Sequence, residues 1–131
     1  MLNLAIINDD YCNKKKEDLE ILIVSQKIET QSRLTEMCLD ADINDTQIHQ
    51  TNTISDIAEF IKKGITKIIL DAELYNYFGS CILNEFIENN TVKVLINHSE
   101  NSHKTIRLIT DTKLGHINSK TSPVILKKLL N

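Results

Sequence analysis

The sequence is poor in residues that bend, crosslink or loosen a chain. Its 131 residues include three glycines, one proline, three cysteines and no tryptophan, and aromatic residues make up 5%. So little glycine and proline excludes a flexible linker or a low-complexity tract. Cys12, Cys38 and Cys81 form no CxxC pair and are odd in number. They favour reduced thiols in a cytoplasmic protein over a disulfide framework.

The chain also lacks a large charge of one sign and a long apolar run. The chain has 15 basic and 18 acidic residues, for a net charge of −3. It therefore lacks the excess of positive charge that a nucleic-acid-binding or membrane-surface domain carries. The apolar stretch 2–7 has no basic flank and is shorter than a signal-peptide core. No run approaches the roughly 18 apolar residues of a membrane span. We expect a cytoplasmic domain without direct contact to nucleic acid or membrane.

What the sequence does contain is a regular alternation of short aliphatic runs and helical patterns. Strands are expected at 20–24, 47–51, 67–71, 92–96 and about 116–117, and helices at 28–39, 55–63, 79–89, 102–110 and 122–130. In the second helix we expect Ser55 as N-cap and Gly64 just past the end. This alternation predicts an α/β fold with a doubly wound, five-stranded parallel sheet in the flavodoxin-like order 2-1-3-4-5.

Residues 1–19 do not fit that scheme, so we expect an N-terminal extension before a single domain at 20–131. The stretch 2–7 is predicted to be an extra strand, and Lys14 to Lys16 a solvated turn. The extra strand can pair with a sheet edge or with a second copy of the chain, which makes a homodimer an expected state.

Several polar residues follow the predicted strands, where open α/β sheets bind their ligands. Asp71 closes the aliphatic run 67–71. The other candidates are Ser25 and Gln26 after the first strand, Asn97 after the fourth with Ser99 as a substitute, and Ser119 and Lys120 after the fifth. A structural role for Asp71, as a helix-capping or turn-forming residue, is the competing interpretation.

Four features together resemble the receiver (CheY-like) domain of two-component response regulators, over about residues 20–131. They are the run 21–24, the strand ending at Asp71, Gly79 eight residues later, and the segment from Gly115 to Pro123. That closing segment is most similar to receivers that precede LuxR-type helix-turn-helix domains. The resemblance implies a phosphate-accepting aspartate at position 71.

In that family an acidic pair and the acceptor aspartate hold Mg²⁺, a Thr or Ser senses the phosphoryl group, and a Lys neutralises it. Here the corresponding positions hold Ser25 and Gln26 (the acidic pair), Asn97 (Thr or Ser) and Ser119 (Lys), with Lys120 one residue late and expected on the opposite face. Phosphoryl transfer depends on metal and cation to cancel charge. We therefore expect a degenerate pocket, with no metal and no cofactor.

Alternative assignments stay open. Asp9 and Asp10 can replace Ser25 and Gln26 as the acidic pair if the strand at 2–7 is the first of the sheet. Tyr75, Tyr77 and Phe78 are expected to form a lid or core, or else a protein contact. The four histidines, His49, His98, His103 and His116, show no metal-binding spacing.

The resulting hypothesis is a pseudo-receiver that signals through protein-protein contacts, as the regulatory domain of a response regulator or transcription factor, and is not an enzyme. The resemblance implies an interaction surface with Ile106, Leu108, Lys120, Pro123 and Leu126. Two alternatives remain. One is a phosphorylatable receiver with an atypical site at Asp71, and the other is a localisation or dimerisation domain before the ATPase of TadZ/CpaE-type pilus assembly proteins.

Overall fold

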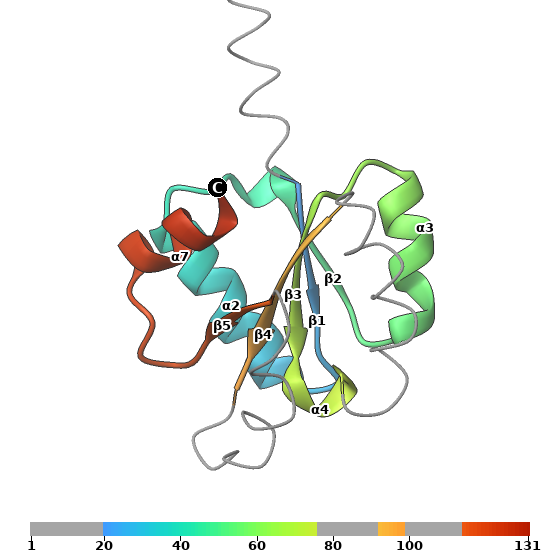
Figure 1. Cartoon of the computed structure of the whole chain (residues 1–131), viewed down its shortest axis with the longest axis horizontal. Coiled ribbons are helices and arrows are strands. Elements are labelled where there is room, and N and C mark those ends of the chain that lie inside the picture. The colour runs from blue at the N-terminus through green and yellow to red at the C-terminus, as the bar shows by residue number, and fades with distance from the viewer. Residues whose placement is uncertain (1–19, 76–91, 99–113) are drawn as a thin grey trace, which may run out of the picture.

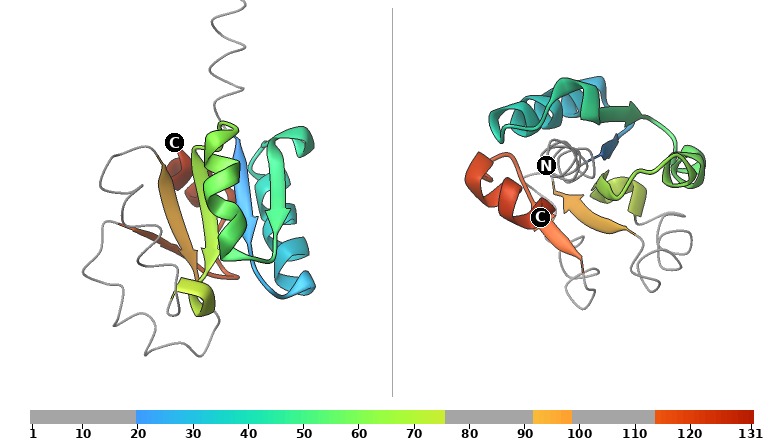
Figure 2. Two further views of the ribbon diagram at one scale, coloured as in Figure 1. Left: turned by 90° about the vertical axis from the view of Figure 1, so that its right-hand side faces the viewer. Right: turned by 90° about the horizontal axis from the view of Figure 1, so that it is seen from above.

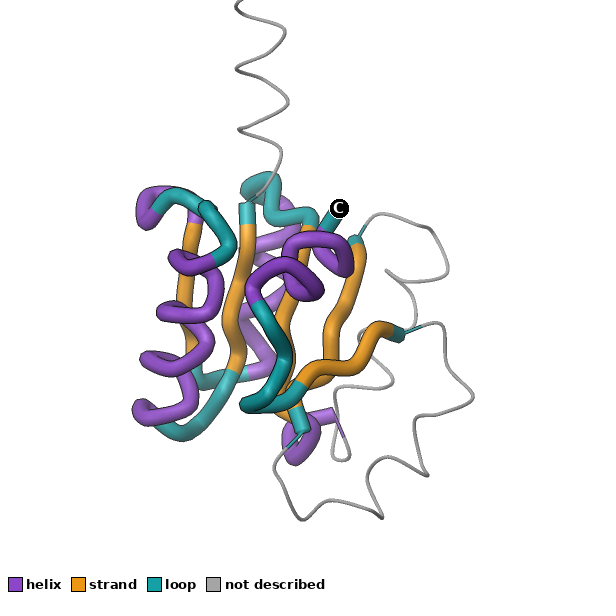
Figure 3. The backbone as a smooth tube through the Cα atoms, turned by 90° about the vertical axis from the view of Figure 1, so that its left-hand side faces the viewer, coloured by secondary structure: helices purple, strands orange, loops and turns teal. Residues whose placement is uncertain are grey.

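The computed structural model describes residues 20–75, 92–98 and 114–131. Within them, five parallel strands form one sheet in the order β2-β1-β3-β4-β5. The strands are β1 (Ile21–Val24), β2 (Ile48–Thr51), β3 (Lys67–Asp71), β4 (Lys93–Asn97) and β5 (Gly115–Ile117). Figure 3 shows them side by side in orange. The predicted flavodoxin-like α/β fold is confirmed.

Helices cover both faces of this sheet. They are α2 (Ile28–Asp40), α3 (Ile57–Lys62), the single turn α4 (Ala72–Leu74) and α7 (Pro123–Leu130), with short 3₁₀ turns η1 (Asp45–Gln47) and η2 (Ile54–Asp56). Helices α2 and α7 lie on one face and α3 on the other (Figures 1 and 2). In the described parts of the chain, no helix combines the length and apolar character needed to cross a bilayer.

The alternation of side chains along the strands divides the core into two clusters, one on each face. The cluster on the α3 face contains Leu22, Val24, Ile57, Ile65, Ile68, Leu70, Ala72, Leu74, Tyr75, Val92, Val94, Ile96 and Leu114. The cluster on the α2/α7 face contains Ile21, Ile23, Leu34, Cys38, Ala41, Ile43, Ile69, Leu95, Ile117, Leu126 and Leu130. Strand β1 is fully buried on both faces, as expected for a central strand of a parallel sheet.

Gly115 is required by a close approach between β5 and β4. A methyl group added at its Cα would overlap Leu95 Cδ2 and touch Leu129 Cδ2. Leu95 is completely buried in the α2/α7 cluster, so its side chain has little room to move. The glycine therefore lets the edge strand and α7 pack tightly on β4.

The two helices between β1 and β3, α2 and α3, both end in a Schellman motif. After α3, the amide of Gly64 donates to Ile61 O and that of Ile65 to Phe60 O, both at 3.1 Å, and Gly64 has φ +108°. This confirms the predicted helix end at Gly64. After α2, Asp42 takes the same position with φ 66°, although it carries a side chain. Left-handed backbone at this position strongly favours glycine and tolerates asparagine.

Replacing Asp42 by glycine is therefore expected to raise the free energy of unfolding by about 0.5–1 kcal/mol. Asp42 also places a negative charge at the negative end of the α2 dipole. Its contact with Lys127 spans 3.9 Å between exposed groups and contributes little. Asp42→Asn should recover part of the gain and Asp42→Ala should destabilise. Urea denaturation of the three variants measures the order, and Asp42→Gly below wild type would contradict it.

The structure corrects several local expectations. Ser55 is not the N-cap of the second helix, because it lies inside η2 and α3 starts only at Ile57. The Thr51 hydroxyl donates to Asp56 Oδ2 at 2.9 Å, which ties β2 to the 3₁₀ turn. By contrast, Ser122 and Pro123 start α7 as predicted, with Ser122 Oγ accepting from Ile125 N at 3.3 Å. The predictions for 2–7, 79–89 and 102–110 lie outside the described residues.

Candidate functional site

The candidate site lies at the carboxyl ends of β1, β3 and β4. The chain leaves β1 toward β2 on one side of the sheet and returns to β3 on the other side, which makes this edge the topological switch point. Ser25, Asp71 and Asn97 come from the ends of these three strands. In each strand they share a face with Ile23, Ile69 and Leu95, which belong to the α2/α7 cluster. We call these three polar residues the carboxyl-edge cluster.

The cluster is closed by hydrogen bonds from neutral donors to a buried carboxylate. Ser25 Oγ donates to Asp71 Oδ2 at 2.9 Å, and Asn97 Nδ2 donates to Asp71 Oδ1 at 3.2 Å. Ser25 is completely buried, and Asn97 and Asp71 are 2% and 8% exposed. Arg33 on α2 donates from Nη2 to Asn97 Oδ1 at 3.4 Å, and among the described residues it forms no ion pair with Asp71. Both carboxylate oxygens therefore already have a partner.

A second set of hydrogen bonds holds the loops around the cluster. Gln31 Nε2 on α2 donates to Ser25 O at 2.7 Å and to Thr51 O at 3.2 Å, joining the ends of β1 and β2. The amide of Lys27 donates to Ser25 Oγ at 3.1 Å. Farther out, the exposed Lys27 Nζ pairs with Glu73 Oε1 at 3.3 Å. Ser25 is thus a fixed part of the scaffold as well as a donor to Asp71.

This donor set does not fit a Mg²⁺ ion. Mg²⁺ takes oxygen ligands in near-octahedral array, and protein sites supply them as one or two carboxylates with substrate phosphates. The cluster has one carboxylate, and each of its oxygens accepts a hydrogen bond. Gln26 is exposed to solvent. Among the described residues there is no group of three or more His, Cys, Asp or Glu side chains arranged to hold a metal.

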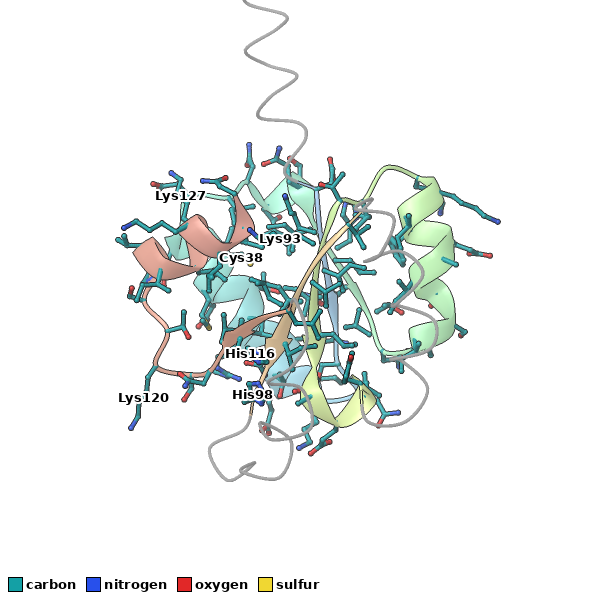
Figure 4. All side chains as sticks on the ribbon, viewed as in Figure 1. Cys38, Lys93, His98, His116, Lys120 and Lys127 are labelled. Atoms are coloured by element: carbon teal, nitrogen blue, oxygen red, sulfur yellow. The ribbon has the colours of Figure 1, made fainter. Side chains whose placement is uncertain are left out.

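The structure brings only part of the predicted site together. Lys120 lies in an exposed turn after β5, and its side chain points away from the sheet (Figure 4). Its amide donates to Asn118 Oδ1 at 2.8 Å, which fixes that turn. Ser119 is in the same exposed turn. Ser99 and the alternative pair Asp9 and Asp10 lie outside the described residues.

The predictions for Leu126 and Tyr75 have different outcomes: the first is wrong, and for the second the core alternative holds. Leu126 cannot belong to an interaction surface, because it is fully buried in the α2/α7 cluster. Helical periodicity turns the residues just before it outward instead, and Val124 and Ile125 are 66% and 52% exposed. Tyr75 is not a lid over the crevice but part of the α3-face cluster, and it is 7% exposed. Tyr77, Phe78, Ile106 and Leu108 lie outside the described residues.

Sequence reasoning missed Gln31, Arg33 and a contact between His98 and His116. Gln31 and Arg33 read as ordinary polar residues of an amphipathic helix, and no spacing marks them as facing inward. The histidine contact joins β4 to β5, and only the strand register brings the two residues together. Cys38 gives no reactive group, because burial raises the pKa of its thiol to about 12.

Comparison with known proteins informs only the fold. No family model and no curated protein matches the chain. Among the similar solved structures is one with a TM-score of 0.57 and 14% identity over 84% of this chain and 74% of that one. It is a yeast Spc42 trimeric coiled coil, amino acids 181–211, fused to another structure. A segment that short cannot span 84% of this chain, so the likeness lies in the remainder of that structure.

Proposed function

We propose that this chain is a pseudo-receiver, a regulatory domain that signals through protein-protein contacts without Mg²⁺-dependent phosphorylation of Asp71. The flavodoxin-like fold and the place of Asp71 at its switch point are compatible with the receiver resemblance. The single observation that carries the proposal is the hydrogen-bonded closure of Asp71 by Ser25 and Asn97. Each oxygen of Asp71 is thereby held by a neutral side-chain donor, which a metal ion or a phosphoryl group would have to displace or share.

Two requirements of phosphoryl transfer, a metal site and a cation beside the transferred group, are unmet in the described site. A metal would have to displace the Ser25 hydroxyl and would then find a single carboxylate. Lys120, the residue closest in sequence to the family's lysine position, points to solvent (Figure 4). The Arg33 guanidinium donates its hydrogen bond to the side-chain oxygen of Asn97. Without a cation beside the transferred group, charge on its equatorial oxygens is not cancelled and the barrier stays high.

The proposal predicts that the protein neither binds Mg²⁺ at millimolar concentration nor forms an adduct at Asp71. Amide NMR spectra of the full chain should not change on addition of Mg²⁺ and beryllofluoride, and intact mass should not change with acetyl phosphate. The positive control is Ser25→Asp/Gln26→Asp, which restores the acidic pair and should gain Mg²⁺-dependent shifts around Asp71. Stoichiometric modification of wild-type Asp71 would instead support the atypical phosphorylatable receiver.

The start of α7 is the contact surface that the described structure favours. Val124 and Ile125 expose apolar side chains there, directly after Pro123, and Lys120 is exposed in the turn that precedes the helix. Exposed apolar side chains beside one another are suited to protein contacts. The proposal includes a cytoplasmic location, with which the free, buried Cys38 is compatible, and a homodimer. Sedimentation equilibrium of the full chain tests the dimer, and loss of the dimer in Val124→Asp/Ile125→Asp would assign it to this surface. A monomer mass for the wild type would contradict it.

A further inference from the structure

We propose that His98 and His116 form a proton-sensitive contact, closed when both imidazoles are neutral and opened when the pair takes up a proton. His98 directly follows β4, and His116 lies in the middle of β5. His98 Nε2 and His116 Nδ1 are 2.9 Å apart, and the rings stack with centroids 5.1 Å apart and planes at 26° (Figure 4 labels both). This inference does not depend on the proposed function.

Burial fixes which ring donates. His98 is 5% exposed, and its Nδ1 has no hydrogen-bond partner among the described residues. A buried N–H without an acceptor costs more free energy than an unpaired nitrogen lone pair, because the donor loses its hydrogen bond to water and gains none in return. The assigned tautomer therefore places the His98 proton on Nε2, from which it donates to His116 Nδ1. The exposed His116 then turns its own Nε2–H to water.

An added proton has no good place in this closed arrangement. On His98 it would sit at Nδ1, as a buried charged N–H without a partner. On His116 it would sit at Nδ1, against the proton that His98 already donates, unless His98 changes to the tautomer with an unpaired Nδ1–H. Protonation therefore disfavours the closed contact, because every protonated arrangement either leaves a buried donor unsatisfied or breaks the contact.

The surroundings of the pair favour the neutral form of both imidazoles. Burial lowers the pKa of both histidines from 6.5, and for His98 the neighbouring His116 lowers it further while Asp71 partly offsets the effect. Because the folded pKa lies below the unfolded value, the unfolded state binds more protons and stability rises with pH. The closed contact is fully stable above pH 6.5 and weakens as pH falls from 6.5 toward the lowered folded values. The effect saturates below them.

Opening of the contact between His98 and His116 is expected to affect both strand β5 and the carboxyl-edge cluster. Strand β5 has three residues and pairs with β4 alone in the described sheet. The amide of His98 donates to Ile117 O at 2.9 Å, so the backbone bond and the ring contact hold the same junction. Asn97, the preceding residue, donates to Asp71. A proton on the pair is therefore expected to loosen β5 and to disturb the hydrogen bonds of Asp71.

The test is an NMR titration of the full chain between pH 8 and pH 4.5. Long-range ¹H–¹⁵N spectra should show the Nε2–H tautomer of His98 at high pH and titration of both rings below the ordinary histidine range. Amide exchange of His98, corrected for its intrinsic rate, should accelerate about tenfold for each pH unit below 6.5 until the folded pKa is reached. The amide of Lys93, which bonds Thr66 O at the other end of β4, is the internal control and should not follow.

Two variants separate a proton-sensitive pair from a merely structural one. His98→Gln should remove the coupling between the two ring titrations and the pH response of β5, whereas His49→Gln, outside the pair, should leave both unchanged. The wild-type titration decides the matter alone if His98→Gln does not fold. Ordinary and independent titration of the two rings, a His98 proton on Nδ1, or His98 exchange that only parallels Lys93 would each overturn the proposal.

Discussion

Replacing Leu95 by alanine is expected to lower the free energy of unfolding by about 2–5 kcal/mol. Leu95 is completely buried in the α2/α7 cluster at the point where β5 and α7 meet the sheet. Its removal loses transfer free energy and leaves a cavity in the α2/α7 cluster. Urea denaturation measures the change, and Ile125→Ala at a half-exposed position of α7 is the matched control, with a loss below about 1 kcal/mol.

The close approach at Gly115 makes this prediction sharper. Gly115→Ala alone should cost about 1–3 kcal/mol, because the new methyl group overlaps Leu95 Cδ2 in a packed core. In Leu95→Ala the same methyl enters the space that the leucine has left. The double variant should therefore lose less stability than the sum of the two single variants. Strict additivity would show that the two side chains do not share the space.

The second large effect is expected for Ser25→Ala, at about 2–3 kcal/mol. The substitution removes the hydroxyl that donates to Asp71 Oδ2 and accepts from the Lys27 amide. It leaves one oxygen of a buried carboxylate without its donor. Ser55→Ala, at an exposed serine, is the control and should change stability by less than about 0.5 kcal/mol.

A double-variant cycle distinguishes this hydrogen bond from simple packing. Removing both partners, in Ser25→Ala/Asp71→Ala, should cost clearly less than the two single losses added together, because no uncompensated charge remains buried. If Ser25→Ala lies within about 0.5 kcal/mol of wild type, the cluster is not a stabilising network. The claim that Asp71 is engaged structurally would then fail.

Sequence patterns predicted the fold well because burial leaves a simple periodic trace. The run Ile21–Val24 is apolar at every position because β1 is covered on both faces. Gly64 marks the end of α3 by its left-handed backbone, and Ser122 marks the start of α7 by the hydrogen bond that its side chain accepts. Ser55 misled for a local reason. A serine before an apolar helical pattern is a good N-cap, but the Thr51–Asp56 hydrogen bond inserts a 3₁₀ turn and moves the helix start.

The position of the candidate site could be predicted from the sequence, but the hydrogen bonds between its side chains could not. Asp71 and Asn97 were recognised because each follows a buried strand. That Ser25 binds Asp71, across 46 residues of sequence, depends on strand register, which no local pattern encodes. The same holds for His98 and His116, whose contact requires Asn97 to pair with Ile117. Leu126 was misplaced because an apolar residue of a terminal helix serves equally well in a core or in an interface.

The packing of α7 has a consequence for how this domain forms during synthesis. Leu126 and Leu130 complete a cluster that begins with Ile21 and Ile23. The part of that face that α7 covers therefore stays open to water until residue 130 has left the ribosome. A nascent chain that ends before α7 leaves the α2/α7 cluster without Leu126 and Leu130, and an incomplete apolar cluster is the kind of surface that chaperones bind.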